Sequence, residues 1–299
     1  MKTIVENLRA KGEQIALLLN DLSKHSSIRR WNFKDDGSLV FVGGDFAWNK
    51  LDDRGRQLQA ECLEQYRRFH ALLQTLLREQ PDDTLRELRD TDRQILGIIQ
   101  QQDLLFADNI KSYFEAALSA FKTQIDLINR LYGTATGKIV LVPDTNALIF
   151  NPDLTKWTYA GIPEFIILLT PTVLSELDNL KVNHRVESVQ KKAEQLIRQL
   201  KEFRRRAADR GGSLAEGATL VTGVSEIVAG AIEPQIQKSL PWLDPANKDD
   251  QILAGVIEAM RTRPHSPVLL VTRDINLQNK ADFAGIPFLE PPDPSAVVG

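Results

Sequence analysis

The 299-residue sequence lacks features that mark several common classes of protein. It has one cysteine, Cys62, which excludes an internal disulfide and any cysteine-rich zinc site. No apolar run approaches the roughly 18–20 residues needed to cross a bilayer. The first residues mix charges into apolar positions and so lack a signal-peptide core. These absences predict a cytoplasmic protein with no membrane partner.

Signatures of several enzyme classes are missing as well. His184 and His265 stand alone, with no serine, cysteine or second histidine at a catalytic or metal-binding spacing. Neither a Walker loop nor a Gly-x-Gly-x-x-Gly motif is present, which argues against an ATPase or a dinucleotide enzyme. The net charge of −3 means that any affinity for nucleic acid must come from local basic surface.

The pattern that is present changes near the middle of the chain. Residues 1–132 repeat apolar side chains at three- and four-residue spacings, which predicts a helical domain. An Asp36-Gly37 step between apolar runs predicts a β-hairpin at about 31–42. Residues 138–290 alternate strand-like and helix-like segments, and 291–299 are predicted to be a disordered tail.

Regular strand–helix alternation predicts an α/β fold in the second half, a Rossmann-type parallel sheet sandwiched by helices. The mainly α-helical first half contains no convincing chemical site. One interpretation makes it a surface for homodimerisation or for docking a protein partner, and another makes it an arm that positions RNA. The sequence alone leaves both open.

Four acids share one structural context in the second half. Each follows a predicted strand or begins the helix after it: Asp144, Glu176, Asp249 and Asp274. Right-handed crossovers bring the ends of parallel strands to one edge of a sheet, so we expect these carboxylates to cluster. Clustered carboxylates repel unless a cation relieves them, and hard oxygen ligands select Mg²⁺ or Mn²⁺. The pattern therefore predicts a divalent metal site.

A basic helix is predicted between the second and third acids. Residues 185–210 hold nine Lys and Arg against four Asp and Glu. One interpretation is a solvated helix face, and the other is a surface that contacts RNA phosphates. The residues predicted to bind nucleic acid are Lys191, Lys192, Arg198, Arg204, Arg205 and Arg206.

The acids lie in four motifs that together resemble those of a known family. The motifs are Val142-Pro-Asp144-Thr-Asn146-Ala-Leu, Val173-Leu-Ser-Glu176-Leu-Asp178-Asn-Leu-Lys181, Asp249-Asp250-Gln-Ile-Leu and Val271-Thr272-Arg273-Asp274-Ile-Asn-Leu. In order, spacing and context they look like the signatures of the PIN domain. The resemblance covers about 138–290 and is closest to PIN domains found with PhoH-type ATPases and in RNA-decay nucleases.

This resemblance implies an endoribonuclease that hydrolyses phosphodiester bonds of single-stranded RNA by metal-activated water, with Mg²⁺ or Mn²⁺ as cofactor. It implies that Asp144, Glu176, Asp249 and Asp274 are the catalytic, metal-binding acids. It also implies supporting polar roles for Asn146 and Thr272. Asp250 is the alternate third acid, and Asp249 is preferred because Ile252-Leu253 then keep the family's offset.

The sequence leaves two other functions open. The fold occurs without chemistry in some proteins, so the chain could be a non-catalytic RNA- or protein-binding scaffold. A structure-specific DNA nuclease resembles the same fold but needs DNA-gripping elements that the sequence does not display. An aspartyl phosphatase is disfavoured because Asn146 stands where a second aspartate is needed.

Overall fold

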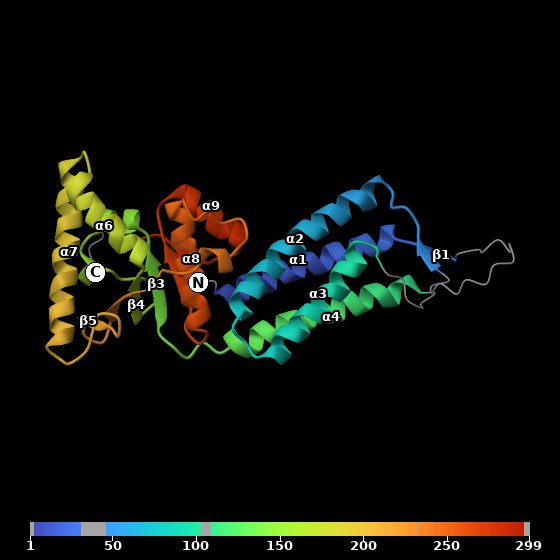
Figure 1. Cartoon of the computed structure of the whole chain (residues 1–299), viewed down its shortest axis with the longest axis horizontal. Coiled ribbons are helices and arrows are strands. Elements are labelled where there is room, and N and C mark those ends of the chain that lie inside the picture. The colour runs from blue at the N-terminus through green and yellow to red at the C-terminus, as the bar shows by residue number, and fades with distance from the viewer. Residues whose placement is uncertain (1–2, 31–45, 103–108, 232, 296–299) are drawn as a thin grey trace. The chain divides into compact units, whose positions relative to one another are not determined.

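The chain forms two compact units in a computed structural model (Figure 1). The structure describes residues 3–30, 46–102, 109–231 and 233–295. One unit is Leu8–Leu131, and the other joins Met1–Asn7 to Tyr132–Gly299. The hairpin predicted at about 31–42 lies outside the described residues. Among the helices that are described, none has the length and apolar character needed to cross a membrane.

The Leu8–Leu131 unit is helical, as predicted. Its helices are α1 (Ile4–His25, of which the first residues belong to the other unit), α2 (Asp53–Leu77), α3 (Asp82–Ile99) and α4 (Ile110–Tyr132). The predicted apolar faces are buried, for example at Leu72, Ile95 and Phe121. A small antiparallel pair, β1 (Ile28–Arg30) with β2 (Phe46–Trp48), completes the described part.

The second unit is built on one six-stranded sheet. Its strands are β3 (Ile139–Pro143), β4 (Phe165–Leu169), β5 (Ala218–Val221), β6 (Ser225–Ala229), β7 (Val268–Val271) and β8 (Phe288–Leu289). Their order is β5-β6-β4-β3-β7-β8, and every neighbouring pair is parallel except β5 with β6. The predicted fold class, a largely parallel sheet within an α/β unit, is confirmed.

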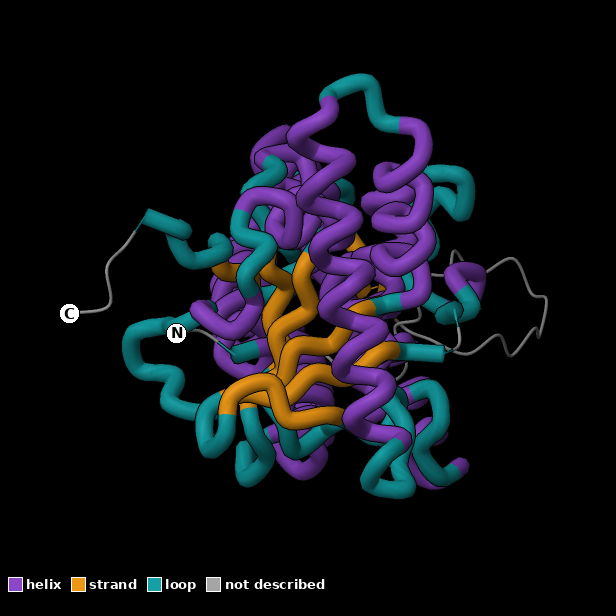
Figure 2. The backbone as a smooth tube through the Cα atoms, turned by 90° about the vertical axis from the view of Figure 1, so that its left-hand side faces the viewer, coloured by secondary structure: helices purple, strands orange, loops and turns teal. Residues whose placement is uncertain are grey.

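Helices cover both faces of this sheet. They are α5 (Thr145–Phe150), α6 (Pro171–Asn183), α7 (Glu187–Ala208), α8 (Lys248–Thr262) and α9 (Ile275–Ala284), with short 3-10 turns at Leu154–Lys156 and Ile236–Lys238. Figure 1 places α6 and α7 on one side of the strands and α8 and α9 on the other. Figure 2 views the unit from the α7 side, with that helical layer in front of the strands.

Burial on both faces explains the uniformly apolar strands. Val140, Leu141, Val142 and all four residues of β7 are buried, as expected for a parallel sheet between helical layers. Gly255 allows α8 to come close to the start of α6, because a Cβ there would lie 2.9 Å from the Thr170 Cγ2 atom. The close approach places the middle of α8 against the N-cap residue of α6.

β4 begins at Phe165, two residues after Pro163, which has no N–H to donate to a sheet. Within the tail that is predicted to be disordered, Pro291 is buried and the Pro292 carbonyl accepts a hydrogen bond from Asn151 at 3.0 Å. Residues 296–299 lie outside the described part.

Candidate functional site

The order of the strands reverses at β3, and we call the region at the carboxyl ends of β3 and β7 the crevice. From β3 the chain continues to β4 and β6 on one side, and it later returns to β7 and β8 on the other. Ligand sites in open α/β sheets form where the order reverses in this way. Pro143 is paired with Val271, so the next residues, Asp144 and Thr272, emerge side by side at this point.

Asp144 is fixed at the carboxyl end of β3 by hydrogen bonds to both of its oxygens. It is the N-cap of α5, and its Oδ1 accepts a hydrogen bond from the Ala147 N–H at 2.6 Å. Its Oδ2 accepts one from the Thr272 hydroxyl at 2.5 Å. The carboxylate is only 2% exposed. A buried acid fixed at both oxygens costs stability unless something compensates its charge.

The electrostatics show that other acids lie near Asp144. The pKa of Asp144 is raised to about 6. Burial is the largest cause, the hydrogen bonds from Thr272 and Ala147 oppose it, and the negative charges of Asp274 and Asp249 also raise the pKa. The pKa of Asp249 is also raised, first by burial and then by Asp274 and Asp250, while Lys280 lowers it. The structure therefore brings Asp144, Asp249 and Asp274 into one electrostatic cluster.

Thr272 links two members of this cluster. Its side chain is fully buried, donates to Asp144 and accepts a hydrogen bond from the backbone N–H of Asp274 at 2.9 Å. Asp274 in turn caps α9, where its Oδ1 accepts from the N–H groups of Asn276 and Leu277 at 2.8 and 3.2 Å. One threonine hydroxyl thus sets the relative positions of two acids from different strands.

The adjacent pair Asp249 and Asp250 divides into two environments. Asp250 is buried, and its oxygens accept hydrogen bonds from Lys280 Nζ at 2.7 Å and from the Asp244 N–H at 2.9 Å. Asp249 is less buried and lies 3.8 Å from Lys280 Nζ. Asp250 therefore anchors the start of α8, while Asp249 keeps its carboxylate closer to the acids of the crevice.

Glu176 and Asn146 are placed differently from the other predicted residues. Glu176 lies on α6, and its Oε2 accepts a hydrogen bond from the Thr145 hydroxyl at 2.5 Å, which ties it to the residue that follows Asp144. Asn146 is exposed on the first turn of α5. Glu176 thus approaches the crevice through Thr145, and it is not among the charges that raise the pKa of Asp144.

The cluster can be compared with the needs of a divalent cation. Within the described residues, no three His, Cys, Asp or Glu side chains are already arranged to hold a metal ion. The donor chemistry nevertheless fits, because carboxylates that raise one another's pKa values gain from a hard cation. Asp144, Asp249 and Asp274, with Glu176 beside them, are the residues that would hold such an ion.

The predicted nucleic-acid-binding residues lie on α7, and most of their charge is locally compensated. Salt bridges within the helix join Lys191 to Glu187, Arg198 to Glu194, and both Arg205 and Arg206 to Glu202. The guanidinium of Arg206 also stacks over Phe203 at 4.7 Å. Arg204 is exposed and Lys192 is half-buried. Four of the six predicted residues are therefore paired with acids of the same helix.

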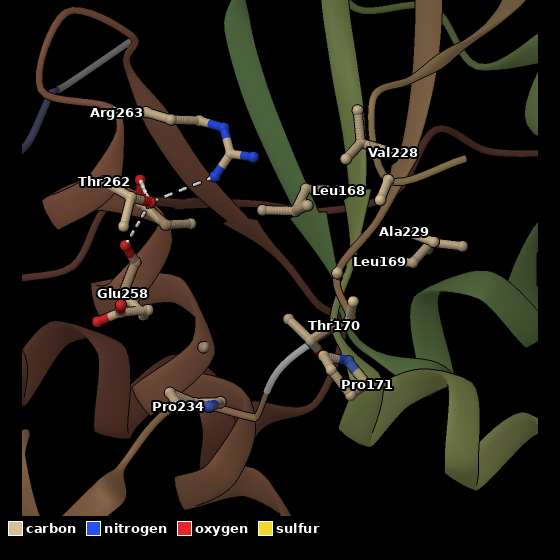
Figure 3. Close-up of a pocket in the computed structure, with 15 residues that line it drawn as sticks. Leu168, Leu169, Thr170, Pro171, Val228, Ala229, Pro234, Glu258, Thr262 and Arg263 are labelled. Carbon is tan, nitrogen blue, oxygen red and sulfur yellow. Dashed lines mark hydrogen bonds between the residues drawn. The ribbon is translucent and has the colours of Figure 1, made fainter. Parts of the chain in front are cut away.

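A pocket of about 290 Å³ lies apart from the acids. Figure 3 shows Glu258, Thr262 and Arg263 on one side of it and Leu168 and Val228 on the other. Its described lining is mostly apolar and includes none of the four predicted acids. The crevice chemistry therefore does not depend on this pocket.

Sequence reasoning missed two contributors to the crevice. Lys280 is 30 residues from Asp250, so no local pattern connects them. Thr145 adjoins Asp144 in the first motif, but its contact with Glu176 depends on how α5 meets α6. The Lys280 contact requires knowledge of the fold, whereas the position of Thr145 beside a predicted acid was a usable signal.

Comparison with known proteins agrees with this geometry. A family model described as the PIN domain matches residues 141–290, which is half of the chain. The match begins in β3, just before Asp144, and ends after β8, so it spans every element that supplies an acid to the crevice. No curated protein matches the chain.

Proposed function

The chain belongs to the PIN-domain family, and from that premise we propose that it is a metal-dependent endoribonuclease of single-stranded RNA. Proteins of this family are typically nucleases and generally use divalent metals. The observation that carries the proposal is the cluster of Asp144, Asp249 and Asp274 at the strand-order reversal. The choice of RNA rests on the resemblance of the four motifs to RNA-decay PIN domains.

The residues of the crevice have distinct proposed tasks. Asp144, Asp249, Asp274 and Glu176 hold Mg²⁺ or Mn²⁺, which when bound supplies an activated water and stabilises charge on the phosphoryl group. Thr272 fixes the orientation of Asp144 and the backbone of Asp274. Asp144 and Asp274 are also the N-cap residues of α5 and α9.

Lys280 completes this arrangement by compensating Asp250. Its ammonium group lies 2.7 Å from Asp250 and 3.8 Å from Asp249. Because Asp250 is buried, an uncompensated charge there would be strongly unfavourable. This pairing supports Asp249, in preference to Asp250, as the third acid of the active site.

A cleavage assay on a mixed panel tests the proposal. Wild-type protein is incubated with unstructured RNA, structured RNA, single-stranded DNA and flap DNA, each with Mn²⁺, with Mg²⁺ and with EDTA. We expect cleavage of unstructured RNA with either metal and none with EDTA. Metal-independent cleavage, or cleavage confined to the DNA substrates, would contradict the assignment.

A non-catalytic RNA-binding scaffold is the second candidate, because the described acids do not already form a metal site. Stability measurements separate the two. Without a bound metal, the pKa of Asp144 is raised from its usual 3.8 to about 6, with burial as the largest cause. The folded state therefore binds this proton more tightly, and the resulting stabilisation is full below pH 3.8 and lost as the pH rises through 6.

We therefore expect a pH-dependent difference between wild type and Asp144→Asn. Between pH 4 and pH 7.5, the variant should gain up to roughly 3 kcal/mol in unfolding free energy relative to wild type. Urea unfolding in EDTA at both pH values measures this, with the exposed Asp178→Asn as control. Mn²⁺ at pH 7.5 should then stabilise wild type and not Asp144→Asn. Parallel pH curves with no effect of Mn²⁺ would favour the scaffold.

The basic face of α7 is proposed to contact RNA phosphates. Reversal of Arg204, Arg205 and Arg206 to Glu should weaken RNA binding and reduce the slope of log affinity against log salt by about 2, since each single-strand phosphate contact contributes about 0.7. Fluorescence anisotropy at several salt concentrations measures this slope.

A matched control for this variant is the helical unit. Arg86, Arg89 and Arg93 are exposed on α3, and their reversal to Glu changes the net charge equally. If the salt slope of the α7 variant is unchanged, or if both variants change it equally, the basic face of α7 does not contact RNA and is only a solvated surface.

A further inference from the structure

Large apolar side chains are exposed next to the acid crevice. Trp242 is 36% exposed and Phe283 is 40% exposed, and their rings meet at 90° with centroids 5.2 Å apart. Ile275, at the start of α9, is 69% exposed. We call Trp242 and Phe283 the aromatic patch. Isolated exposed apolar residues are common, but an aromatic pair beside a candidate active site calls for a functional explanation.

The patch is connected to the crevice through α9. Ile275 directly follows Asp274, and Phe283 lies eight residues, or just over two turns, further along the same helix. At 1.5 Å per residue, this separation is about 12 Å. Phe283 of the patch therefore lies about two helical turns along α9 from Asp274.

A second connection runs through Asp250. Lys280, one turn before Phe283, binds one oxygen of Asp250, and the backbone N–H of Asp244, two residues after Trp242, binds the other. Both aromatic residues are thus tied to the residue that adjoins Asp249. Their distance from the active-site acids is set by hydrogen bonds, so the patch has a defined position in the unit.

The chemistry of the surroundings favours a nucleic-acid strand. Single-stranded nucleic acids bind where aromatic faces stack on bases and nearby cations attract the backbone. The exposed Arg273 precedes Asp274 at the start of α9, and its guanidinium lies over the Phe150 ring at 3.8 Å. Lys280 is paired with Asp250 and Asp249, so Arg273 is the cation that would attract the backbone of the strand. By contrast, the exposed apolar residues at Val182 and Val186 are aliphatic and cannot stack on a base.

We propose that Trp242 and Phe283 form a base-stacking site that holds a single-stranded RNA along α9, on one side of the scissile phosphodiester. The identity of the strand rests on the proposed function. A length of about 12 Å corresponds to three or four bases stacked at ~3.4 Å. The site therefore selects substrates with at least that many nucleotides beyond the bond that is cleaved.

Binding measurements without cleavage test this site. Asp144→Asn protein in EDTA is titrated into fluorescein-labelled oligouridine of twelve nucleotides and into a strand of equal length without bases. Trp242→Leu keeps an apolar side chain but removes the ring, and should weaken oligouridine binding about 5- to 100-fold. Binding of the baseless strand should not change. Trp242→Phe should retain most of the affinity, and the control Val182→Ala should retain all of it.

A length series gives a second measurement. Affinity should rise steeply between two and five nucleotides in the Asp144→Asn background and only gradually once Trp242→Leu is added. Intrinsic fluorescence provides a check that depends less on folding of the leucine variant, since oligouridine should quench emission more in the Asp144→Asn protein than after Trp242→Phe is added.

The possible outcomes distinguish this site from the proposed function. If Trp242→Leu leaves the affinity for oligouridine unchanged, and the protein with intact Asp144 still cleaves RNA, the stacking site is overturned and the nuclease proposal stands. Base-dependent loss of binding in a protein that never cleaves RNA supports the stacking site and overturns the nuclease. If Trp242→Leu changes only the oligomeric state seen by light scattering, the patch is a contact between copies of the chain and the proposal fails.

Discussion

Asp144→Asn is expected to lower metal-dependent cleavage of unstructured RNA by at least about 10³-fold, equivalent to roughly 4 kcal/mol in the activation free energy. The substitution keeps the shape of the side chain but removes the negative charge at the centre of the acid cluster. Asp144 is buried, fixed at both oxygens and influenced by Asp249 and Asp274, so loss of its charge weakens the whole proposed cation site. The measurement is kcat/KM for a labelled RNA, with folding checked by circular dichroism.

Controls for this variant use acids outside the cluster and the ambiguous pair. Asp178→Asn removes an exposed carboxylate from α6 and should cleave like wild type. Asp249→Asn should lose cleavage with little loss of stability, whereas Asp250→Asn should mainly lose stability, because it breaks the pair with Lys280. Equal residual cleavage by wild type and Asp144→Asn would identify the activity as contamination and end the enzyme interpretation.

Thr272→Val is expected to damage both stability and cleavage. Valine preserves the shape of the buried side chain but removes the hydroxyl that donates to Asp144 and accepts from the Asp274 N–H. Leaving these groups without a partner should lower the free energy of unfolding by about 1–3 kcal/mol. Cleavage should fall by about 10²-fold, because two proposed metal ligands lose their common support.

Thr272→Ser is the matched control, since it retains the hydroxyl and removes only a methyl group. It should keep most of the cleavage activity, although loss of the methyl group reduces packing. Urea unfolding and kcat/KM are compared for the three proteins. A valine variant that cleaves RNA at the wild-type rate would show that Thr272 does not position the acids.

The α/β fold could be predicted because its sequence signals are local. The apolar run that starts at Ile139 and the N-cap residue Thr170 each determine the structure of only the next few residues. The structure contains both the strand and the capped helix. The register of the sheet then converts chain position into proximity. Pairing of Pro143 with Val271 makes neighbours of Asp144 and Thr272, which are 128 residues apart.

The remaining parts of the site depend on contacts that leave no local trace. The role of Asp250 is set by Lys280 from another helix, and the connection of Glu176 passes through Thr145. The contact between Trp242 and Phe283 could not be predicted from the sequence, because the two residues are far apart in the chain and share no motif. The strand order decides that β3 and β7 form the crevice, and sequence alternation does not specify that order.

The first seven residues of the chain belong to the same unit as the acids, and this affects how that unit can be isolated. Asn7 donates a hydrogen bond at 3.1 Å to the carbonyl of Gly285, the left-handed residue that ends α9. Ile4 and Val5 are buried as well. An excised fragment starting after residue 137 would therefore leave a gap at the far end of the helix that Asp274 begins. A minimal fragment that keeps this unit intact needs residues 4–7 restored, either by fusion or as a separate peptide.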